Sequence, residues 1–515
     1  MPIKRKIRSK QHTVAAGDIT AKRKIRSKQY TIAADEITAK ITITDDPDNL
    51  IGTYELSVPE MDPATAAFYE DLKTDLLKKI KISTQEYLDI KLTEDLKHRF
   101  RETSTLMALE RIPRLTEKQA QYIAGRLVQE MLGLGSMEFL LKDDLIEEIC
   151  INNSVDPIWV YHKEFGWLKT NITIPLESQI WNYSSAIARR VGRQITVQTP
   201  LLDAYLVTGD RVNATIAPIS SAGNTITIRK FARKPWTITD FIRSKTMSKE
   251  VAAFLWLAVQ YETSMILSGG TGSGKTSLLN VLCSFFPSNQ RVVSIEQTRE
   301  VTLPSHLQWV PLVVREATTE GKGQITMLDL LVNSLRMRPD RIIVGEIRRA
   351  EEAQVLFEAI HTGHSVYATM HAETISETIR RIASPPIALP PVMMESLPLI
   401  ITMFRDRRSG IRRIFEVGEL IPAKFGEEKP PEVRTLFRWR PSTDKIEKVN
   451  ESLRIFNTLK TFTSMDRREI NGTIKERSEV LDWLVKNDID SVEEVGQIFA
   501  SYYRDSDKVM KKIRK

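Results

Sequence analysis

The stretch "LSGGTGSGKTS" at residues 267–277 has the residue types and spacing to hold a nucleotide phosphate. Its glycines let successive backbone N–H groups curl around phosphate oxygens, and a following helix adds the positive end of its dipole. A lysine in this position reaches the β- and γ-phosphates, and the next hydroxyl can ligate Mg²⁺. The residues expected to bind the nucleotide are Gly269, Gly270, Thr271, Gly272, Ser273, Gly274, Lys275, Thr276 and Ser277.

The flanking sequence predicts a strand before this loop and a helix after it. "SMIL" (264–267) is a short apolar run, and "TSLLNVLCSFF" (276–286) has the length and composition of a helix. This strand–loop–helix context is the one that the motif requires, so a chance glycine-rich turn explains it poorly. We therefore expect ATP and Mg²⁺ as cofactors.

Three later strands end in polar residues suited to phosphate chemistry. "RVVSIEQTRE" places Glu296 and Glu300 after a β-branched run, "RIIVGE" ends in Glu346, and "SVYATMHA" brings His371 after a third run. Singly, each acid would more often be a solvated turn residue and the histidine a packed one. Because parallel α/β sheets gather the carboxyl ends of their strands at one edge, we expect these side chains beside the phosphate loop.

Hydrolysis of a nucleoside triphosphate assigns a role to each of these groups. Glu346 is placed to act on Mg²⁺ directly or through a water, together with Thr276 as a metal ligand. Either Glu300 or Glu296 could activate the attacking water. His371 could sense the γ-phosphate and pass its presence to neighbouring elements.

Taken together, the motifs resemble those of the secretion and pilus-assembly ATPases, which serve type II secretion, type IV pili, type IV secretion and the archaellum. The resemblance is carried by "GGTGSGKTS", the acidic box "SIEQTRE", the atypical Walker B "LRMRPDRIIVGEIR" and the histidine box "TGHSVYATMHA". It extends from about residue 130 to "YYRDSDKV" near the C-terminus. "FRDRRSGIRRIFEVGEL" and the helical C-terminus are most similar to the archaeal branch.

The resemblance implies a hexameric ring of two-domain subunits that bind ATP between an N-terminal and a C-terminal module. In such rings arginines of the N-terminal module meet the triphosphate, partly across a subunit boundary, and Arg211 in "DRVNATI" and Arg229 in "TIRKF" match them. Arginine suits this task because its fork binds phosphate oxygens and keeps its charge. One departure is Gln297, which follows Glu296 where the family usually has Asp. Turnover is still expected, at a reduced rate.

The expected fold class is α/β, with a C-terminal RecA-like P-loop ATPase domain over residues 236–421 and a smaller α+β domain over 148–235. Helical extensions are expected over 41–147 and, after a strand pair, within 422–515. One helix should begin at Thr116, because Thr116 and Gln119 fit a capping box, and should end at "GLGS" (133–136).

Composition sets further bounds. The longest clean apolar run, "VAAFLWLAV" (251–259), falls far short of the roughly 20 residues that span a bilayer, and no signal-peptide core follows the N-terminus. We expect a cytoplasmic protein, associated by its family resemblance with the inner face of the cell membrane. Two cysteines, Cys150 and Cys283, cannot form a four-cysteine zinc site, and no zinc is expected.

The net charge of +8 is concentrated at the N-terminus. Residues 4–21 and 22–39 form a tandem repeat whose copies carry net charges of +4 and +3, so residues 1–40 are expected to be a basic tail. Such a tail fits a solvated arm, and it also fits electrostatic docking onto an anionic membrane, an acidic partner or nucleic acid.

Three hypotheses for function follow. The first is a hexameric ATP-hydrolysing motor that acts with a polytopic membrane platform protein to assemble type IV pilus-like filaments or to drive type II or type IV secretion. The second is a nucleic-acid-linked ATPase that uses the basic tail, although no recognised nucleic-acid module accompanies it. The third, suggested by Gln297, is a nucleotide-binding switch with little turnover. The motifs do not distinguish which filament or secretion system such a motor would serve.

Overall fold

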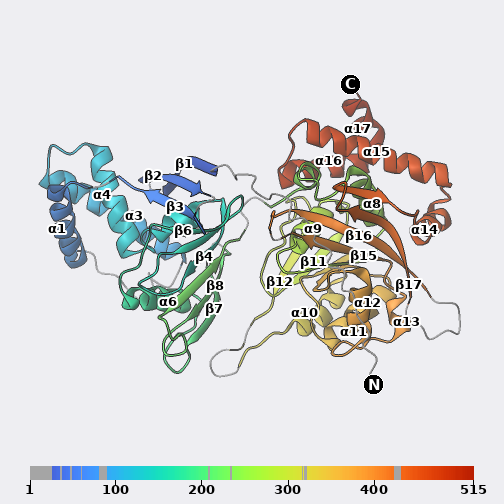
Figure 1. Cartoon of the computed structure of the whole chain (residues 1–515), viewed down its shortest axis with the longest axis horizontal. Coiled ribbons are helices and arrows are strands. Elements are labelled where there is room, and N and C mark those ends of the chain that lie inside the picture. The colour runs from blue at the N-terminus through green and yellow to red at the C-terminus, as the bar shows by residue number, and fades with distance from the viewer. Residues whose placement is uncertain are drawn as a thin grey trace, which may run out of the picture. The chain divides into compact units, whose positions relative to one another are not determined.

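The structure is a computed structural model that forms two compact units, Met1–Lys230 and Phe231–Lys515, which are described separately. Figure 1 shows the elements of both units. The residues described are 26–34, 37–46, 49–59, 61–79, 90–206, 209–231, 235–315, 317, 322–406, 408–422 and 431–514.

The described part of the N-terminal unit is built on a nine-stranded sheet of order β1-β2-β3-β6-β5-β4-β9-β8-β7. Neighbouring strands pair antiparallel except β3 and β6, which are parallel. The strands are β1 (Arg26–Ala34), β2 (Ile37–Asp45), β3 (Gly52–Ser57), β4 (Ile146–Ile151), β5 (Trp159–His162), β6 (Gly166–Thr170), β7 (Leu201–Tyr205), β8 (Arg211–Thr215) and β9 (Thr225–Arg229).

Residues 41–147 were expected to be helical, but β2 and β3 occupy their first part, and the helices of this region begin at Pro63. The helices of this unit are α1 (Pro63–Lys79), α3 (Ile90–Arg111), α4 (Glu117–Met131), α5 (Met137–Lys142) and α6 (Glu177–Arg190). Helix α4 begins after Thr116, whose side chain accepts from the Gln119 N–H while the Gln119 side chain accepts from the Thr116 N–H. The predicted capping box is thus present, and the apolar stripe of α4 is buried from Ala120 to Val128.

Residues 26–34 and 37–39 of the second repeat copy are part of this sheet, which corrects the expectation of a tail over residues 1–40. Strand β1 alternates between outward residues and inward residues such as Lys28 and Tyr30. The Tyr30 hydroxyl donates to Asp143 over 2.5 Å, and Lys28 pairs with Glu164 over 2.5 Å. Part of the basic charge of this copy is therefore used within the fold. The first copy, and with it the rest of the tail, lies outside the described residues.

The C-terminal unit contains a second nine-stranded sheet among its described residues, in the order β12-β11-β13-β14-β10-β15-β16-β17-β18. The strands from β12 to β15 are parallel to their neighbours, and β16 to β18 add an antiparallel edge. They are β10 (Met265–Gly269), β11 (Arg291–Glu296), β12 (Gln308–Val313), β13 (Arg341–Val344), β14 (Ser365–Met370), β15 (Leu399–Arg405), β16 (Arg412–Ile421), β17 (Glu432–Arg440) and β18 (Lys445–Lys448).

Helices cover both faces of this sheet (Figure 1). One face packs against α7 (Ile238–Arg243), α8 (Lys249–Gln260), α9 (Lys275–Cys283), α14 (Arg454–Thr463), α15 (Arg467–Lys486), α16 (Val492–Arg504) and α17 (Ser506–Ile513). The other packs against α10 (Met327–Ser334), α11 (Ala350–His361), α12 (Ile375–Ala383) and α13 (Pro391–Met394), and the 3-10 turn η1 (Leu335–Met337) follows α10. Burial on both faces explains the continuous apolar runs of the central strands.

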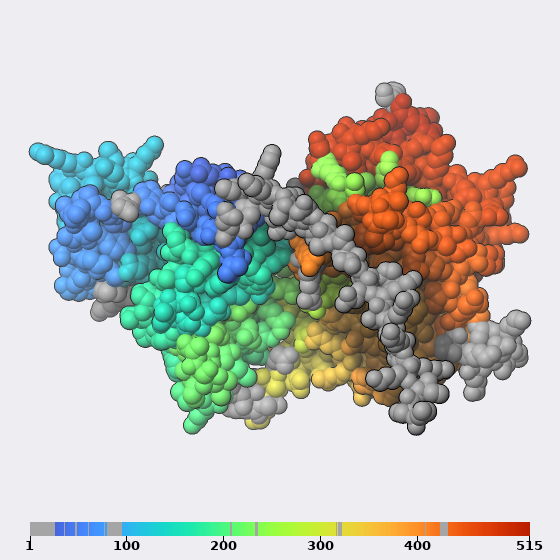
Figure 2. Space-filling view, in the orientation of Figure 1, coloured from blue at the N-terminus to red at the C-terminus, as the bar shows by residue number. Residues whose placement is uncertain are grey.

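The C-terminal segment that was expected as a separate part over residues 422–515 is continuous with the sheet of this unit. Strands β17 and β18 extend the same sheet, and Figure 2 shows the surfaces of β16–β18 (orange) and of the C-terminal helices (red) adjoining. The buried Glu419 of β16 accepts hydrogen bonds from the Ser452 hydroxyl, over 2.6 Å, and from the backbone N–H groups of Leu453 and Arg454. It thereby ties the start of α14 to the sheet.

Arg341 at the start of β13 is fully buried beneath the sheet's amino ends. Its guanidinium donates to the Val259 carbonyl over 2.7 Å, to Gln290 Oε1 over 2.6 Å and to the Tyr367 hydroxyl. It also lies 4.6 Å over the Phe286 ring. These contacts join α8, β11, β13 and β14 through one side chain.

Replacing Arg341 should therefore destabilise the C-terminal unit. Arg341→Met leaves the Val259 carbonyl and other buried polar groups without a partner, and we expect a loss of about 3 kcal/mol. Urea denaturation followed by circular dichroism measures it. The exposed Arg336→Ala serves as the control and should change stability by less than about 0.5 kcal/mol. A loss at Arg341 no larger than that of the control would contradict this reading of the core.

Candidate nucleotide-binding site

The predicted phosphate loop joins the end of β10 to the start of α9, as its flanking sequence indicated. Gly272 and Gly274 have φ angles of 69° and 96°, in the left-handed region that favours glycine. Lys275 opens the helix, and its Nζ donates to the carbonyl oxygens of Gly269 and Gly270, each over 3.0 Å. The loop thus curls around its own lysine. The N-terminus of α9 is aimed at the same space.

Strand β14 places His371 directly beside this lysine. Ser268 of β10 pairs with Met370, so the next residue of β14 emerges at the level of the loop. The Nδ1 of His371 lies 3.5 Å from Lys275 Nζ, and its Nε2 lies 3.1 Å from Glu346 Oε1. Burial and then the charge of Lys275 lower the pKa of His371, so the neutral imidazole is favoured.

Strand β13 delivers Glu346 to the same place, as the sequence predicted. Besides His371, its carboxylate faces Arg348, whose Nε donates to Oε2 over 2.9 Å. Arg348 also donates to Gln297 Oε1 over 2.7 Å. Successive polar contacts thus connect Lys275 to Gln297 through His371, Glu346 and Arg348. Arg348 was missed by sequence reasoning, although it stands within the quoted "GEIR".

Glu296 and Glu300 were alternatives for activating water, and the structure uses them differently. The Glu296 carboxylate is buried, and its Oε1 accepts from the backbone N–H groups of Glu300, over 2.8 Å, and Val301, over 3.0 Å. Burial raises the pKa of Glu296 to about 7. Glu296 therefore shapes the loop after β11, whereas Glu300 is the partly exposed acid of that loop.

Arg211 and Arg229 belong to the N-terminal unit and lie side by side there. They pair across β8 and β9 in the register of the sheet. Arg211 is held by Asp203 in a two-pronged contact, with nitrogen–oxygen distances of 3.0 and 2.6 Å. Arg229 is exposed at the end of β9. Asp203 was not singled out from the sequence, since only the pairing of β7 with β8 brings it to Arg211.

Two further arginines, Arg405 and Arg412, contact the phosphate loop. Arg412 Nε donates to the Gly272 carbonyl over 3.1 Å, and the Arg405 guanidinium touches Gly272. Sequence reasoning assigned them no role. Their only signal was the basic run "FRDRRSGIRR", in which three other arginines have the same appearance.

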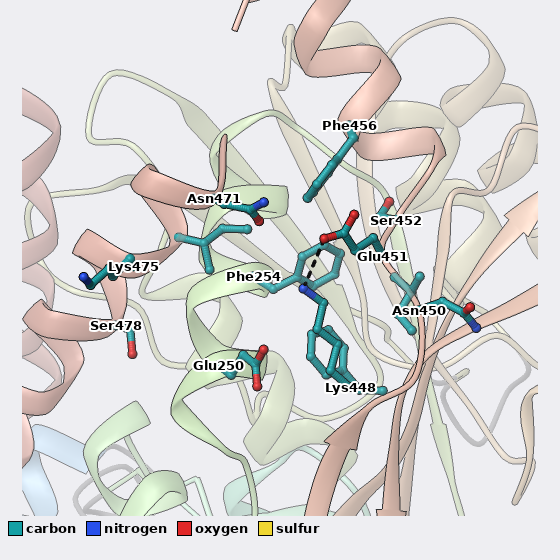
Figure 3. Close-up of a pocket in the computed structure, with 13 residues that line it drawn as sticks. Glu250, Phe254, Lys448, Asn450, Glu451, Ser452, Phe456, Asn471, Lys475 and Ser478 are labelled. Atoms are coloured by element: carbon teal, nitrogen blue, oxygen red, sulfur yellow. Dashed lines mark ion pairs between the residues drawn. The ribbon is translucent and has the colours of Figure 1, made fainter. Parts of the chain in front are cut away.

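A separate cavity of about 380 Å³ lies between α8, β17–β18, α14 and α15. Figure 3 shows Phe254 and Phe456 on its walls and the Lys448–Glu451 ion pair, 3.8 Å long, at its side. No residue of the phosphate loop lines it. The cavity therefore belongs to the packing of the C-terminal helices and not to the nucleotide site.

Comparison with known proteins places this site in a family. Residues 134–405, which include the phosphate loop, Glu346 and His371, match the family described as Type II/IV secretion system protein. The chain belongs to this family. The expectation of a secretion or pilus ATPase relationship is thereby confirmed at the level of the superfamily.

Individual relatives of this Type II/IV secretion system protein come from several organisms. Protein MJ0900 of Methanocaldococcus jannaschii is 33% identical over 396 residues, which are 76% of this chain and 71% of MJ0900. The type IV secretion system protein PtlH of Bordetella pertussis is 31% identical over 259 residues, 46% of this chain and 76% of PtlH. The VirB11 ATPase of the Brucella suis type IV secretion system, solved with sulphate, is 25% identical and aligns with a TM-score of 0.28 over 54% of this chain and 93% of VirB11.

The described residues lack two further features. No helix there combines the length and apolar character needed to cross a bilayer. No group of three or more His, Cys, Asp or Glu side chains there is arranged to hold a metal ion.

The buried Glu296 predicts a pH dependence of stability in this family member. Between about pH 4.5 and 7, the Glu296 carboxyl keeps a proton in the folded protein that it releases in the unfolded chain, where its pKa is near 4.5. The contribution of this proton to the free energy of unfolding is therefore complete below about pH 4.5 and is lost as the pH rises to about 7. Glu296→Gln keeps the acceptor oxygen and removes the titration. As the pH rises from 5 to 7, the free energy of unfolding of this variant should increase relative to that of wild type by up to about 1 kcal/mol per pH unit.

Thermal unfolding at pH 5, 6 and 7.5 measures this difference. Glu300→Gln is the matched control, because it neutralises the partly exposed acid of the same loop. The interpretation fails if Glu296→Gln and wild type show parallel curves across this range.

Proposed function

We propose that this chain is an ATP-hydrolysing motor of the secretion and pilus-assembly type. The observation that carries the proposal is the convergence of Lys275, His371 and Glu346 at the end of three parallel strands. A lysine and a helix N-terminus bind the phosphates, and the carboxylate stands where water or a metal would be held. Membership in a family with secretion-system ATPases among its relatives supports it.

The donor set of the site suits Mg²⁺. The Thr276 hydroxyl at the start of α9 and the Glu346 carboxylate are hard oxygen groups of the kind that Mg²⁺ prefers. Mg²⁺ bound there would neutralise charge on the phosphates. Arg348, now paired with Glu346, orients that carboxylate. Glu300 is the residue we assign to orienting the attacking water.

The same proposal extends to the assembly. A homo-hexameric ring, with Arg211 and Arg229 completing the site of a neighbouring subunit, would work at the cytoplasmic face of the membrane on a polytopic platform protein. It would power either type IV pilus-like filament assembly or type II or type IV secretion. The basic residues 1–40 would contribute attraction to an anionic membrane surface, apart from those that pair with Glu164.

Variants of the loop lysine and of Glu346 test the assignment. Lys275→Ala removes the main protein cation at the phosphates, and we expect phosphate release from ATP to fall at least about a hundredfold. Glu346→Gln should retain ATP binding and stop turnover, because the Glu346 carboxylate acts in the transition state and not in binding of the ground state. Steady-state phosphate release and binding of a fluorescent ATP analogue give both readings. The exposed Lys460→Ala is the control.

These measurements also separate the alternatives. Retained hydrolysis in Lys275→Ala would contradict the site. A wild-type chain that binds ATP and releases no phosphate would instead be a nucleotide-binding switch. Stimulation by RNA or DNA, and not by anionic lipid, would favour the nucleic-acid-linked ATPase.

Mixing two inactive variants tests whether Arg211 acts on a neighbouring subunit. Arg211→Ala subunits keep the phosphate loop, and Lys275→Ala subunits keep the arginine. If Arg211 serves the neighbouring site, mixed rings contain complete sites and recover part of the wild-type rate. Each variant alone should stay inactive.

A mixture as inactive as its components would show that Arg211 acts within its own subunit or not at all. Asp203→Asn is a useful companion variant. It loosens the two-pronged hold on Arg211 without removing the arginine, so its mixed rings should show intermediate rates.

A further inference from the structure

The β15–β16 hairpin brings two arginines against the phosphate loop. Gly269 of β10 pairs with Met403 of β15, so the last residue of β15, Arg405, extends past the end of β10. Arg405 pairs with Arg412, the first residue of β16. The Arg405 guanidinium occupies the space in which a side chain at Gly272 would begin.

The second arginine makes a directed contact. Arg412 Nε donates to the Gly272 carbonyl over 3.1 Å, and its Cδ lies 3.6 Å from the position of a β-carbon at Gly274. The hydrogen-bond partner is a neutral carbonyl, so it does not cancel the charge of the guanidinium. Two positive charges thus stand beside a loop whose residue types suit phosphate binding.

The described residues of the turn between the strands are hydrogen-bonded to one another. Asp406 accepts from the backbone N–H groups of Arg408, over 3.0 Å, and Ser409, over 3.3 Å, and from the Ser409 hydroxyl, over 2.6 Å. Gly410 supplies a φ of 71°. The backbones of Arg405 and Arg412 at the two ends of the hairpin are held side by side by the pairing of β15 with β16.

The sheet order decides which part of a nucleotide these arginines would meet. Glu346 and His371 come from β13 and β14, on one side of β10, and the hairpin comes from β15 and β16, on the other side. The γ-phosphate must lie toward Glu346 if that residue serves hydrolysis. The remainder of the nucleotide then leaves the loop on the hairpin side.

We propose that Arg412 and Arg405 form the subsite for the α-phosphate and nucleoside end of the bound nucleotide. The proposal rests on the proposed function, because the direction of the nucleotide follows from the role of Glu346. A guanidinium binds phosphate oxygens with two parallel N–H groups and stacks on purine rings, and both contacts are present before and during the reaction. The subsite therefore contributes to binding and not to the chemical step.

Purified full-length protein carrying Arg412→Ala or Arg405→Ala tests this. Each variant should raise the Kd for ADP and the KM for ATP by roughly tenfold, the worth of one charge-assisted contact, and change kcat by less than about twofold. Arg412→Lys keeps the charge without the fork and should recover part of the affinity. Arg408→Ala, at the exposed tip of the same hairpin, is the matched control and should bind ADP as wild type does.

Thermal unfolding separates a binding role from a merely structural one. The Tm without nucleotide should stay close to that of wild type, and the rise in Tm on adding ADP should shrink. Three results would overturn the subsite: an unchanged Kd for ADP, an equal loss of ADP affinity in Arg408→Ala, or a loss confined to kcat and to the Tm without nucleotide.

The failure of the proposed function gives a different pattern. Wild-type protein that binds ADP in an Arg412-dependent manner but never releases phosphate would refute the motor and support the subsite. Wild-type protein without measurable affinity for ADP would refute both.

Discussion

The candidate site depends on one constraint, the parallel pairing of β10 between β14 and β15. This pairing brings three chain segments that are far apart in the sequence to the same edge of the sheet, because Ser268 pairs with Met370 and the next residue, Gly269, pairs with Met403. Because the central strands are buried on both faces, a slip in register would disrupt the packing of side chains against the helices on both faces. The geometry around the phosphate loop is thus set by packing deep within the unit.

Charged and polar side chains lie next to one another along this edge of the sheet. Lys275 contacts His371, and Glu346 lies between His371 and Arg348, so the carboxylate has a cationic partner. A site of this composition avoids the cost of an isolated buried charge. It also means that an incoming phosphate would compete with existing contacts of Lys275 to the loop carbonyls, so binding and rearrangement of the loop are linked.

Local signals in the sequence were sufficient for much of the fold. Apolar β-branched runs identified β11, β13 and β14, the glycine pattern identified the loop, and the capping box located the start of α4. Partners separated by many residues could not be found in this way. Arg348 meets Gln297 only because β11 and β13 pair, and Arg412 meets Gly272 only because β15 lies next to β10.

The second repeat copy was misjudged for a related reason. Its charge dominated the pattern, whereas the period of two in Lys28, Tyr30 and Ile32 marks a strand with one half-buried face. The hydroxyl of Tyr30 reaches Asp143, more than a hundred positions along the chain. A basic composition by itself therefore did not distinguish a tail from an edge strand.

The anchoring of α14 by Glu419 has a mechanical consequence. Strand β16 begins at Arg412 beside the phosphate loop and reaches Glu419 seven residues later, a length of about 23 Å for extended chain. A paired strand is stiff along its axis, and Glu419 bonds its far end to the first turn of α14. The phosphate loop and the C-terminal helices are thus connected through one paired strand, whose register with β17 shifts between Val417 and Gly418.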